Sequence, residues 1–288
     1  MTTIACTDRP ETSRGLAHRI ALLIRYRELM WMLAWRDIRV RYKHSVLGAL
    51  WAVIPPLATM LIFAFVFGTV VQIDRQKLTG DAALPYVLFA FSGLVPWMFF
   101  ANGLTAATGS LVSNRQLVTK IYFPREVFPI STVISSFVDF LIASAVLVVL
   151  ALLLHFQGNG WTYRPHWSIL LTPLVVAVQI CLMLGLGLLL SMANLFYRDV
   201  GFIFRSIIQL WMFVTCVVYQ LEATAGWKRV VIQLNPMTPI IRAYRDCLVF
   251  GRSPLDASFL GATAVSIMIL IVGWHWFRRR EFDFAEHV

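Results

Sequence analysis

The sequence predicts an all-α membrane protein with six transmembrane helices per subunit, an N-terminal amphipathic interfacial helix and a broken re-entrant hairpin between the fifth and sixth spans. Hydrophobic residues make up 59% of its 288 residues and charged residues only 14%, against about 25% charged in soluble domains. Its ten tryptophans and eight tyrosines suit two interfacial belts. The net charge of +10 comes from short clusters beside apolar runs, which disfavours nucleic-acid binding.

The polar residues 1–15 are expected to be disordered and not a cleavable signal peptide. Residues 16–45 are expected to form a cytoplasmic helical region ending in an amphipathic interfacial helix. At 100° per residue its apolar side chains share an arc of roughly 100°: Trp31, Ala34, Trp35, Ile38 and Tyr42. The remaining arc carries the charged side chains of Arg36, Asp37, Arg39, Arg41 and Lys43.

Six apolar runs within residues 46–277 are each long enough to cross a hydrocarbon core of about 30 Å. They are residues 46–71, 85–109, 128–154, 169–193, 200–220 and 258–277. Pro55, Pro56 and Pro96 lie inside these runs. We interpret them as tolerated kinks, because neighbouring helices can satisfy the carbonyls that a proline frees. Gly187 and Ser191 in the fourth run are spaced for close helix packing.

The distribution of Lys and Arg predicts that both termini, including the tail 278–288, lie in the cytoplasm. Residues 1–45 hold nine such cations and the link 110–127 holds three, whereas the links 72–84 and 155–168 hold few. Residues 221–257 carry five cations but fall outside by this count. Because Asn235-Pro236 and Pro239 break this half-apolar segment, we interpret it as re-entrant, with short helices near 227–234 and 238–250.

No catalytic constellation, metal-ligand spacing or phosphate-binding loop motif occurs in the sequence. The chain is therefore expected to be no enzyme, to bind no metal or cofactor, and to draw ATP and Mg²⁺ chemistry from a partner. Asp139 is a carboxylate well inside a span, where a charge costs about 2.5–3.5 kcal/mol. Either it lines a wet cavity, or it is a structural acid bonded to Ser135, Ser136 or an arginine of another helix.

The fifth span has a polar and aromatic face that a lipid-facing helix does not need. One arc of about 80° carries Phe202, Ser206, Gln209, Phe213, Cys216 and Gln220, and the opposite arc carries Phe204, Ile208, Trp211, Thr215 and Tyr219. The first span has a weaker face of Thr59, Phe63 and Phe67. Both faces fit a channel wall along which sugar rings could slide; ordinary interhelical hydrogen bonding is the alternative.

The link 110–127 contains a short amphipathic helix that ends at a proline. Leu117, Lys120, Ile121 and Phe123-Pro124 define it. It fits a coupling helix seated in a cytoplasmic ATPase, or alternatively a helix lying on the membrane surface.

Several motifs together resemble the membrane subunits of type-2 ABC exporters of polysaccharides. They are Arg36-Asp37 with Arg41-Tyr42, Leu47-Gly48, Trp51 and Pro55; the run from Phe91 to Trp97; Asn114 with Leu117, Lys120 and Phe123 to Glu126; Asn194 to Asp199; and Leu234 to Thr238. The resemblance covers nearly the whole chain past residue 25.

The resemblance implies a homodimeric permease of the bacterial cytoplasmic membrane, driven by two separate ATP-binding subunits. Its substrate would be a lipid-linked O-antigen, capsule or teichoic-acid chain, which passes through a channel between the two copies. It implies ATPase coupling by Trp31, Arg36, Asp37, Arg39, Arg41, Lys43, Asn114, Arg115, Gln116, Leu117, Lys120 and Phe123. It implies an external gate at Asn235, Pro236 and Pro239.

Two other functions remain possible from the sequence alone. A type-2 permease for a small amphiphile or drug would share the fold. A membrane-embedded acyl- or glycosyltransferase would need a cluster of histidines or carboxylates at one interface, which the sequence does not suggest.

Overall fold

The computed structural model describes residues 24–43, 47–66, 85–120, 124–156, 166–219 and 226–280. Every regular element in these ranges is a helix, which confirms the all-α prediction. The first 23 residues, Phe67 and Gln220 lie outside the described residues, as do the predicted disordered N-terminus and the cytoplasmic tail beyond Arg280.

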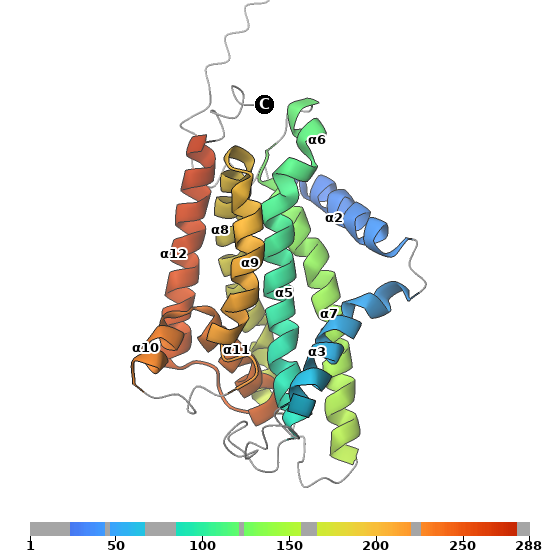
Figure 1. Cartoon of the computed structure of the whole chain (residues 1–288), viewed down its shortest axis with the longest axis vertical. Helices are drawn as coiled ribbons and strands as arrows, with labels where there is room; N and C mark the ends of the chain where they lie inside the picture. The colour runs from blue at the N-terminus through green and yellow to red at the C-terminus, as the bar shows by residue number, and fades with distance from the viewer. Residues whose placement is uncertain are drawn as a thin grey trace, which may run out of the picture.

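Four helices within the described part of the chain are long and apolar enough to cross a membrane: α5 (Tyr86–Ser113), α7 (Val127–Phe156), α8 (Thr172–Phe196, after a 3-10 turn at Trp167–Leu171) and α12 (Ala257–Arg280). They form an upright bundle with α5 near its centre (Figure 1). Most of α5 is buried because α7 and α8 both pack against it. At its internal proline, Gln179 of α8 donates a hydrogen bond of 2.8 Å to the carbonyl of Pro96.

The first and fifth predicted spans are shorter as helices. The first begins with a 3-10 turn at Gly48–Ala52 and continues as α3 (Ile54–Phe65). The fifth is α9 (Asp199–Val214), which ends before the predicted boundary at residue 220. It ends because the Thr215 amide bonds to the Met212 carbonyl and Cys216 takes a positive φ of 50°. Six spans therefore remain a prediction.

Helices α8 and α12 are in close contact where two glycines meet. A Cβ on Gly185 would lie 2.6 Å from the backbone nitrogen of Leu270, and one on Gly273 would collide with the backbone of Gly185. Gly187, which the sequence suggested as a close-packing position, packs closely on α5: a Cβ there would lie 3.1 Å from the Cβ of Ala107, and Ser191 is buried. The two helices are thus in backbone contact along α12.

Helix α2 (Arg27–Tyr42) packs along α7 at the end of the bundle where α6 (Arg115–Lys120) and the end of α12 lie (Figure 1). Its buried residues are Leu33, Ala34 and Ile38. Trp31 and Trp35, predicted to share one apolar arc with Ala34 and Ile38, are 55% and 48% exposed. Ala34 and Ile38 of the predicted arc are thus buried, whereas the two tryptophan rings stay uncovered; that these rings lie among acyl chains at the membrane interface stays a prediction.

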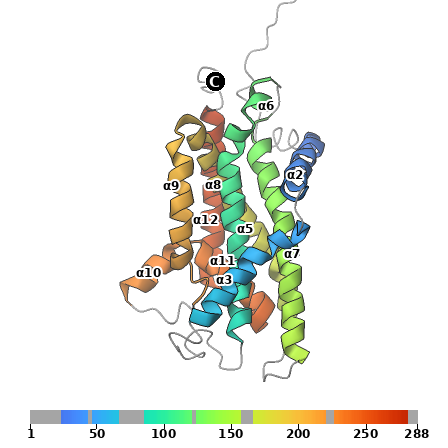
Figure 2. The same cartoon turned by 45° about the vertical axis from the view of Figure 1, so that its right-hand side comes forward.

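The broken segment after α9 lies at the opposite end of the bundle. It forms α10 (Trp227–Leu234), α11 (Met237–Arg245) and a π-helical turn (Asp246–Phe250), close to the predicted pieces. Helix α11 is almost wholly buried and packs against α5, α8 and α12, whereas α10 projects from the bundle (Figures 1 and 2). The α11 part of the segment is thus built into the protein core, whereas α10 is not.

Candidate functional site

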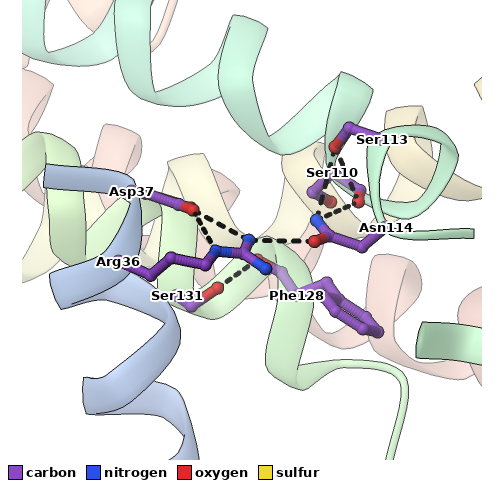
Figure 3. Close-up of polar contacts among 7 residues, drawn as sticks. All are labelled: Arg36, Asp37, Ser110, Ser113, Asn114, Phe128 and Ser131. Atoms are coloured by element: carbon purple, nitrogen blue, oxygen red, sulfur yellow. Dashed lines mark hydrogen bonds and ion pairs between the residues drawn. The ribbon is translucent and has the colours of Figure 1, made fainter. Parts of the chain in front are cut away.

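Arg36 joins the two regions predicted to meet an ATPase. Its guanidinium donates to Asp37 Oδ1 at 2.8 and 3.1 Å and to Asn114 Oδ1 at 2.9 Å (Figure 3). Asp37 lies on the same helix as Arg36, whereas Asn114 is 78 residues away in the sequence. This arginine therefore ties α2 to the end of α5.

Asn114 occupies the junction between α5 and α6. Its side-chain amide donates to the carbonyl of Ser110 at 2.9 Å and to Ser113 Oγ at 3.3 Å (Figure 3). The Ser110 carbonyl also accepts from the Asn114 backbone amide, so backbone and side chain of Asn114 both bind the last turn of α5. Since α6 begins at the next residue, the position of α6 is linked through Asn114 and Arg36 to that of α2.

The remaining predicted coupling residues divide by exposure. Trp31 stacks on Trp35 with ring centroids 6.3 Å apart, and the Arg39 guanidinium lies 6.0 Å from the Trp35 ring. Arg41, Lys43, Arg115 and Gln116 are exposed, whereas Leu117 packs against a buried cluster that includes Leu33 and Phe128. The side chain of Lys120 and the whole of Phe123 lie outside the described residues. Leu117 is therefore partly buried within its own subunit and not fully free to contact an ATPase.

Asp139 is bound by two side chains from the end of α2. Arg41 forms an ion pair with its Oδ2, and the Tyr42 hydroxyl donates to its Oδ1 at 2.5 Å. Burial, reinforced by the bond to Asp139, raises the pKa of Tyr42 to about 12, so this phenol remains a donor at neutral pH. Of the two open interpretations, the structural one fits: Asp139 is a paired acid that fixes α2 to α7.

Helix α9 presents its predicted polar and aromatic face away from the bundle. Phe202, Ser206, Gln209 and Phe213 are exposed, whereas Phe204, Ile208 and Thr215 on the opposite arc are buried. Cys216 was predicted on the exposed face but is buried, because the helix has already ended there. Ile203, Ile207 and Leu210 widen the exposed surface with apolar side chains. In Figure 2, α9 forms the edge of the bundle opposite α2.

The weaker face of the first span is only partly exposed and could line a passage only in part. Thr59 is half-buried, and its hydroxyl donates to the carbonyl of Pro55 at 2.8 Å on the same helix. Phe63 packs partly against the core. The structure does not bring this face together with the exposed face of α9 into one lined passage within the described part of a single subunit.

The predicted gate residues connect α10 and α11 to the end of α9. Asn235 is buried; its amide donates to Thr215 Oγ1 at 2.9 Å, and its Oδ1 accepts from the Met237 amide at 3.1 Å. Pro236 precedes α11 and Pro239 is buried in its first turn, where a missing N–H costs nothing. These residues fix the bend between the two short helices.

Arg245 is a core residue that the sequence interpretation missed. It is only 5% exposed and donates to the carbonyl of Cys216 at 2.9 Å, to that of Val217, and to that of Phe89 at 3.4 Å. Its guanidinium lies 3.8 Å from the Phe89 ring centroid. Gly93 makes room, because a Cβ there would lie 2.6 Å from the Val217 oxygen. One feature of the sequence could have pointed to this role: Arg245 lies in a half-apolar segment whose cations do not fit the Lys/Arg distribution of the other links.

Residues 28–249 match the family described as ABC-2 type transporter. An "O-antigen export system permease protein RfbA" from Myxococcus xanthus is 30% identical over 92% of this chain and 97% of its own length. A protein of the same name from Klebsiella pneumoniae is 29% identical over 90% of this chain and 94% of its own length. A "Polysialic acid transport protein KpsM" from Escherichia coli is 23% identical over 85% of this chain and 91% of its own length. The chain therefore belongs to the ABC-2 type transporter family.

Proposed function

We propose that this chain is the membrane subunit of an ATP-driven exporter that moves a lipid-linked polysaccharide of the O-antigen or capsule type. The observation that carries the proposal is similarity along almost the full length of relatives named for O-antigen export and polysialic acid transport. A partial match would support only a shared fold. We propose that the subunit is a multi-pass protein of the bacterial cytoplasmic membrane, which its apolar bundle supports, and that both termini lie in the cytoplasm, which the distribution of Lys and Arg supports.

The exposed face of α9 supports a channel between two copies of the chain. A helix that faced only lipid would gain nothing from Ser206 and Gln209. Aromatic side chains such as Phe202 and Phe213 offer weak contacts that a sliding sugar chain can exchange one after another. In the homodimer, we propose that the two α9 faces, with Thr59, Phe63 and Phe67 of the first span, line the passage, and that Gln220 and the bend at Asn235 lie near its outer mouth.

The energy for transport is proposed to come from two copies of an ATP-binding subunit, which hold ATP and Mg²⁺. The end of the bundle that carries α2 and α6 would meet them. The contacts of Arg36 with Asp37 and Asn114 make this end a connected surface and not two independent patches. A displacement of α6 by the ATPase would therefore be felt at α2, and through Arg41 and Asp139 by α7.

Deletion of the gene in its host is expected to abolish surface polysaccharide while the lipid-linked polymer accumulates inside the cell. The reason is that the polymer cannot cross the membrane without its channel. Immunoblotting of intact and permeabilised cells measures both pools, and the wild-type gene supplied in trans should restore export. Normal surface polymer together with increased sensitivity to amphiphilic drugs would instead favour a permease for small amphiphiles.

Replacing Arg36 with glutamine is expected to lower the polymer exported per ATP hydrolysed by about tenfold, since a charge-assisted hydrogen bond contributes roughly 1.5–3 kcal/mol. The purified complex should still contain the ATP-binding subunit, because the exposed residues of α6 are unchanged. Arg252→Gln, an exposed arginine at the other end of the bundle, serves as the matched control. An unchanged export-to-hydrolysis ratio in Arg36→Gln would contradict the coupling role.

A further inference from the structure

Arg205 is a charged side chain in an otherwise uncharged stretch of α9. It is the only charged residue from Val200 to Val214, it is exposed, and it makes no hydrogen bond or ion pair with any of the described residues. Six residues separate it from the start of the helix at Asp199, a rise of about 9 Å. A cation at that depth in a membrane is costly unless it faces water or an anion.

The exposed surface of α9 has a polar half and an apolar half. At 100° per residue, the polar half spans about 100° and carries the exposed side chains of Phe202, Arg205, Ser206, Gln209 and Phe213. The adjoining arc of about 60° is aliphatic and carries the exposed side chains of Ile203, Ile207, Leu210 and Val214. A guanidinium that only reached toward lipid headgroups would need no polar neighbours. The division therefore indicates that Arg205 belongs to the side of α9 that faces water.

Arg198 extends the polar half toward the end of the bundle that carries α2 and α6 (Figure 1). It is exposed and, like Arg205, has no partner among the described residues. Seven residues separate the two arginines, so they lie about 20° apart around the helix and about 10 Å apart along it. The acid next in sequence, Asp199, lies about 100° from Arg198 around the helix. The two cations thus form a column that leads from this end of the bundle into the membrane.

The homodimer doubles this column. In a twofold dimer whose axis runs along the membrane normal, a residue that faces the axis meets its own copy at the same depth. The inner end of the passage would then carry four guanidinium groups, and the polar half of α9 holds no carboxylate to balance them. Neutral sugars cannot neutralise this charge. A phosphate group can, since guanidinium groups bind its oxygens through paired, charge-assisted hydrogen bonds.

We propose that Arg198 and Arg205 bind the phosphate linkage that joins the polysaccharide to its lipid. Arg198 meets the phosphate at the inner surface of the membrane, and Arg205 holds it two helical turns farther in. The neighbouring side chains of Phe202 and Gln209 then contact the first sugars. The cations thus select the charged linkage, and the rest of the face accepts the polymer. This inference rests on the proposed function, which puts the exposed face of α9 on the passage.

The test uses the full complex with its ATP-binding subunits in nanodiscs of phosphatidylcholine. The probe is a radiolabelled polyprenyl diphosphate that carries one N-acetylglucosamine, and scintillation proximity measures its binding. Arg205→Gln is expected to weaken binding about tenfold, the effect of one charge-assisted hydrogen bond. Arg205→Lys should weaken it less, because lysine keeps the charge but not the paired geometry. The matched control is Arg279→Gln, an exposed arginine at the same end of the bundle but on α12, which should bind the probe as the wild type does.

Competition separates this site from ordinary lipid contact. Polyprenyl diphosphate should displace the probe, whereas uncharged polyprenol and phosphatidylglycerol at the same concentration should not. Equal affinity in Arg205→Gln and wild type, or displacement by either of these two lipids, would overturn the site while leaving the proposed function intact. A wild-type complex that binds no probe would also overturn the site. If deletion of the gene then left surface polymer unchanged as well, the proposed function would fail with it.

Discussion

Replacing Arg245 with methionine is expected to destabilise the subunit by about 3–5 kcal/mol, a large part of the stability of a typical protein. Methionine fills a similar length of the site but leaves the carbonyls of Cys216, Val217 and Phe89 without their buried donor. The stacking on the Phe89 ring is lost as well. The temperature of half-aggregation in detergent, followed by size-exclusion chromatography, measures the effect.

Arg242→Met is the matched control for this substitution. Arg242 lies on the same helix, but its side chain is 46% exposed and its partner Asp246 is 3.8 Å away. An exposed pair of this kind contributes no more than about 1 kcal/mol. If Arg245→Met proved as stable as Arg242→Met, the buried carbonyl contacts could not be what holds α11 in place.

Replacing Arg41 with methionine is expected to destabilise the subunit by about 2 kcal/mol, because it leaves the Asp139 carboxylate without its cation in an apolar helix. The side chain of Asp139 is only 17% exposed, whereas that of Arg41 is 39% exposed. The reverse change, Asp139→Leu, should cost less, since the freed guanidinium can turn toward water. The loss of stability should therefore be larger when Arg41 is removed than when Asp139 is removed.

A double-mutant cycle tests this asymmetry. The variant that carries both Arg41→Met and Asp139→Leu is expected to recover most of the stability lost in Arg41→Met, because no buried charge remains. The same aggregation assay is suitable. Simple additivity of the two single losses would show that Arg41 and Asp139 do not interact, and would return Asp139 to the role of a cavity-lining acid.

The helical architecture could be predicted from the sequence because the length of an apolar run is a local property; the orientation that Lys and Arg predict stays a prediction. The bounds predicted for the four long helices lie within four residues of those in the structure, and the break near Asn235 falls where it was predicted. The exposed and buried arcs of α9 were also foreseen, since the helical period fixes which side chains share a face. The period could not show that the helix stops at Val214, after which the Thr215 backbone amide bonds to the Met212 carbonyl and Cys216 takes a positive φ.

Features that depend on which helix packs next to a residue could not be predicted from the hydrophobic pattern of the sequence. Small residues recur in α8, and only the position of α12 decides that Gly185 and not Gly187 makes the closest contact. Trp31 and Trp35 looked equivalent to Ala34 until α7 covered one side of α2. The candidate coupling residues rest on resemblance to a family, and no sequence pattern connects Arg36 with Asn114 across 78 residues.

The meeting of Gly185 and Gly273 has a mechanical consequence. With no side chain between their backbones, α8 and α12 cannot slide past each other or part without opening a gap that nothing else can fill. Helices α8 and α12 therefore behave as one rigid unit, against which the shorter helices pack. A signal that travels from one face of the membrane to the other within this subunit would then be carried by the helices outside that pair: α7, which Arg41 and Asp139 link to α2, and α9 with the short helices attached to its end.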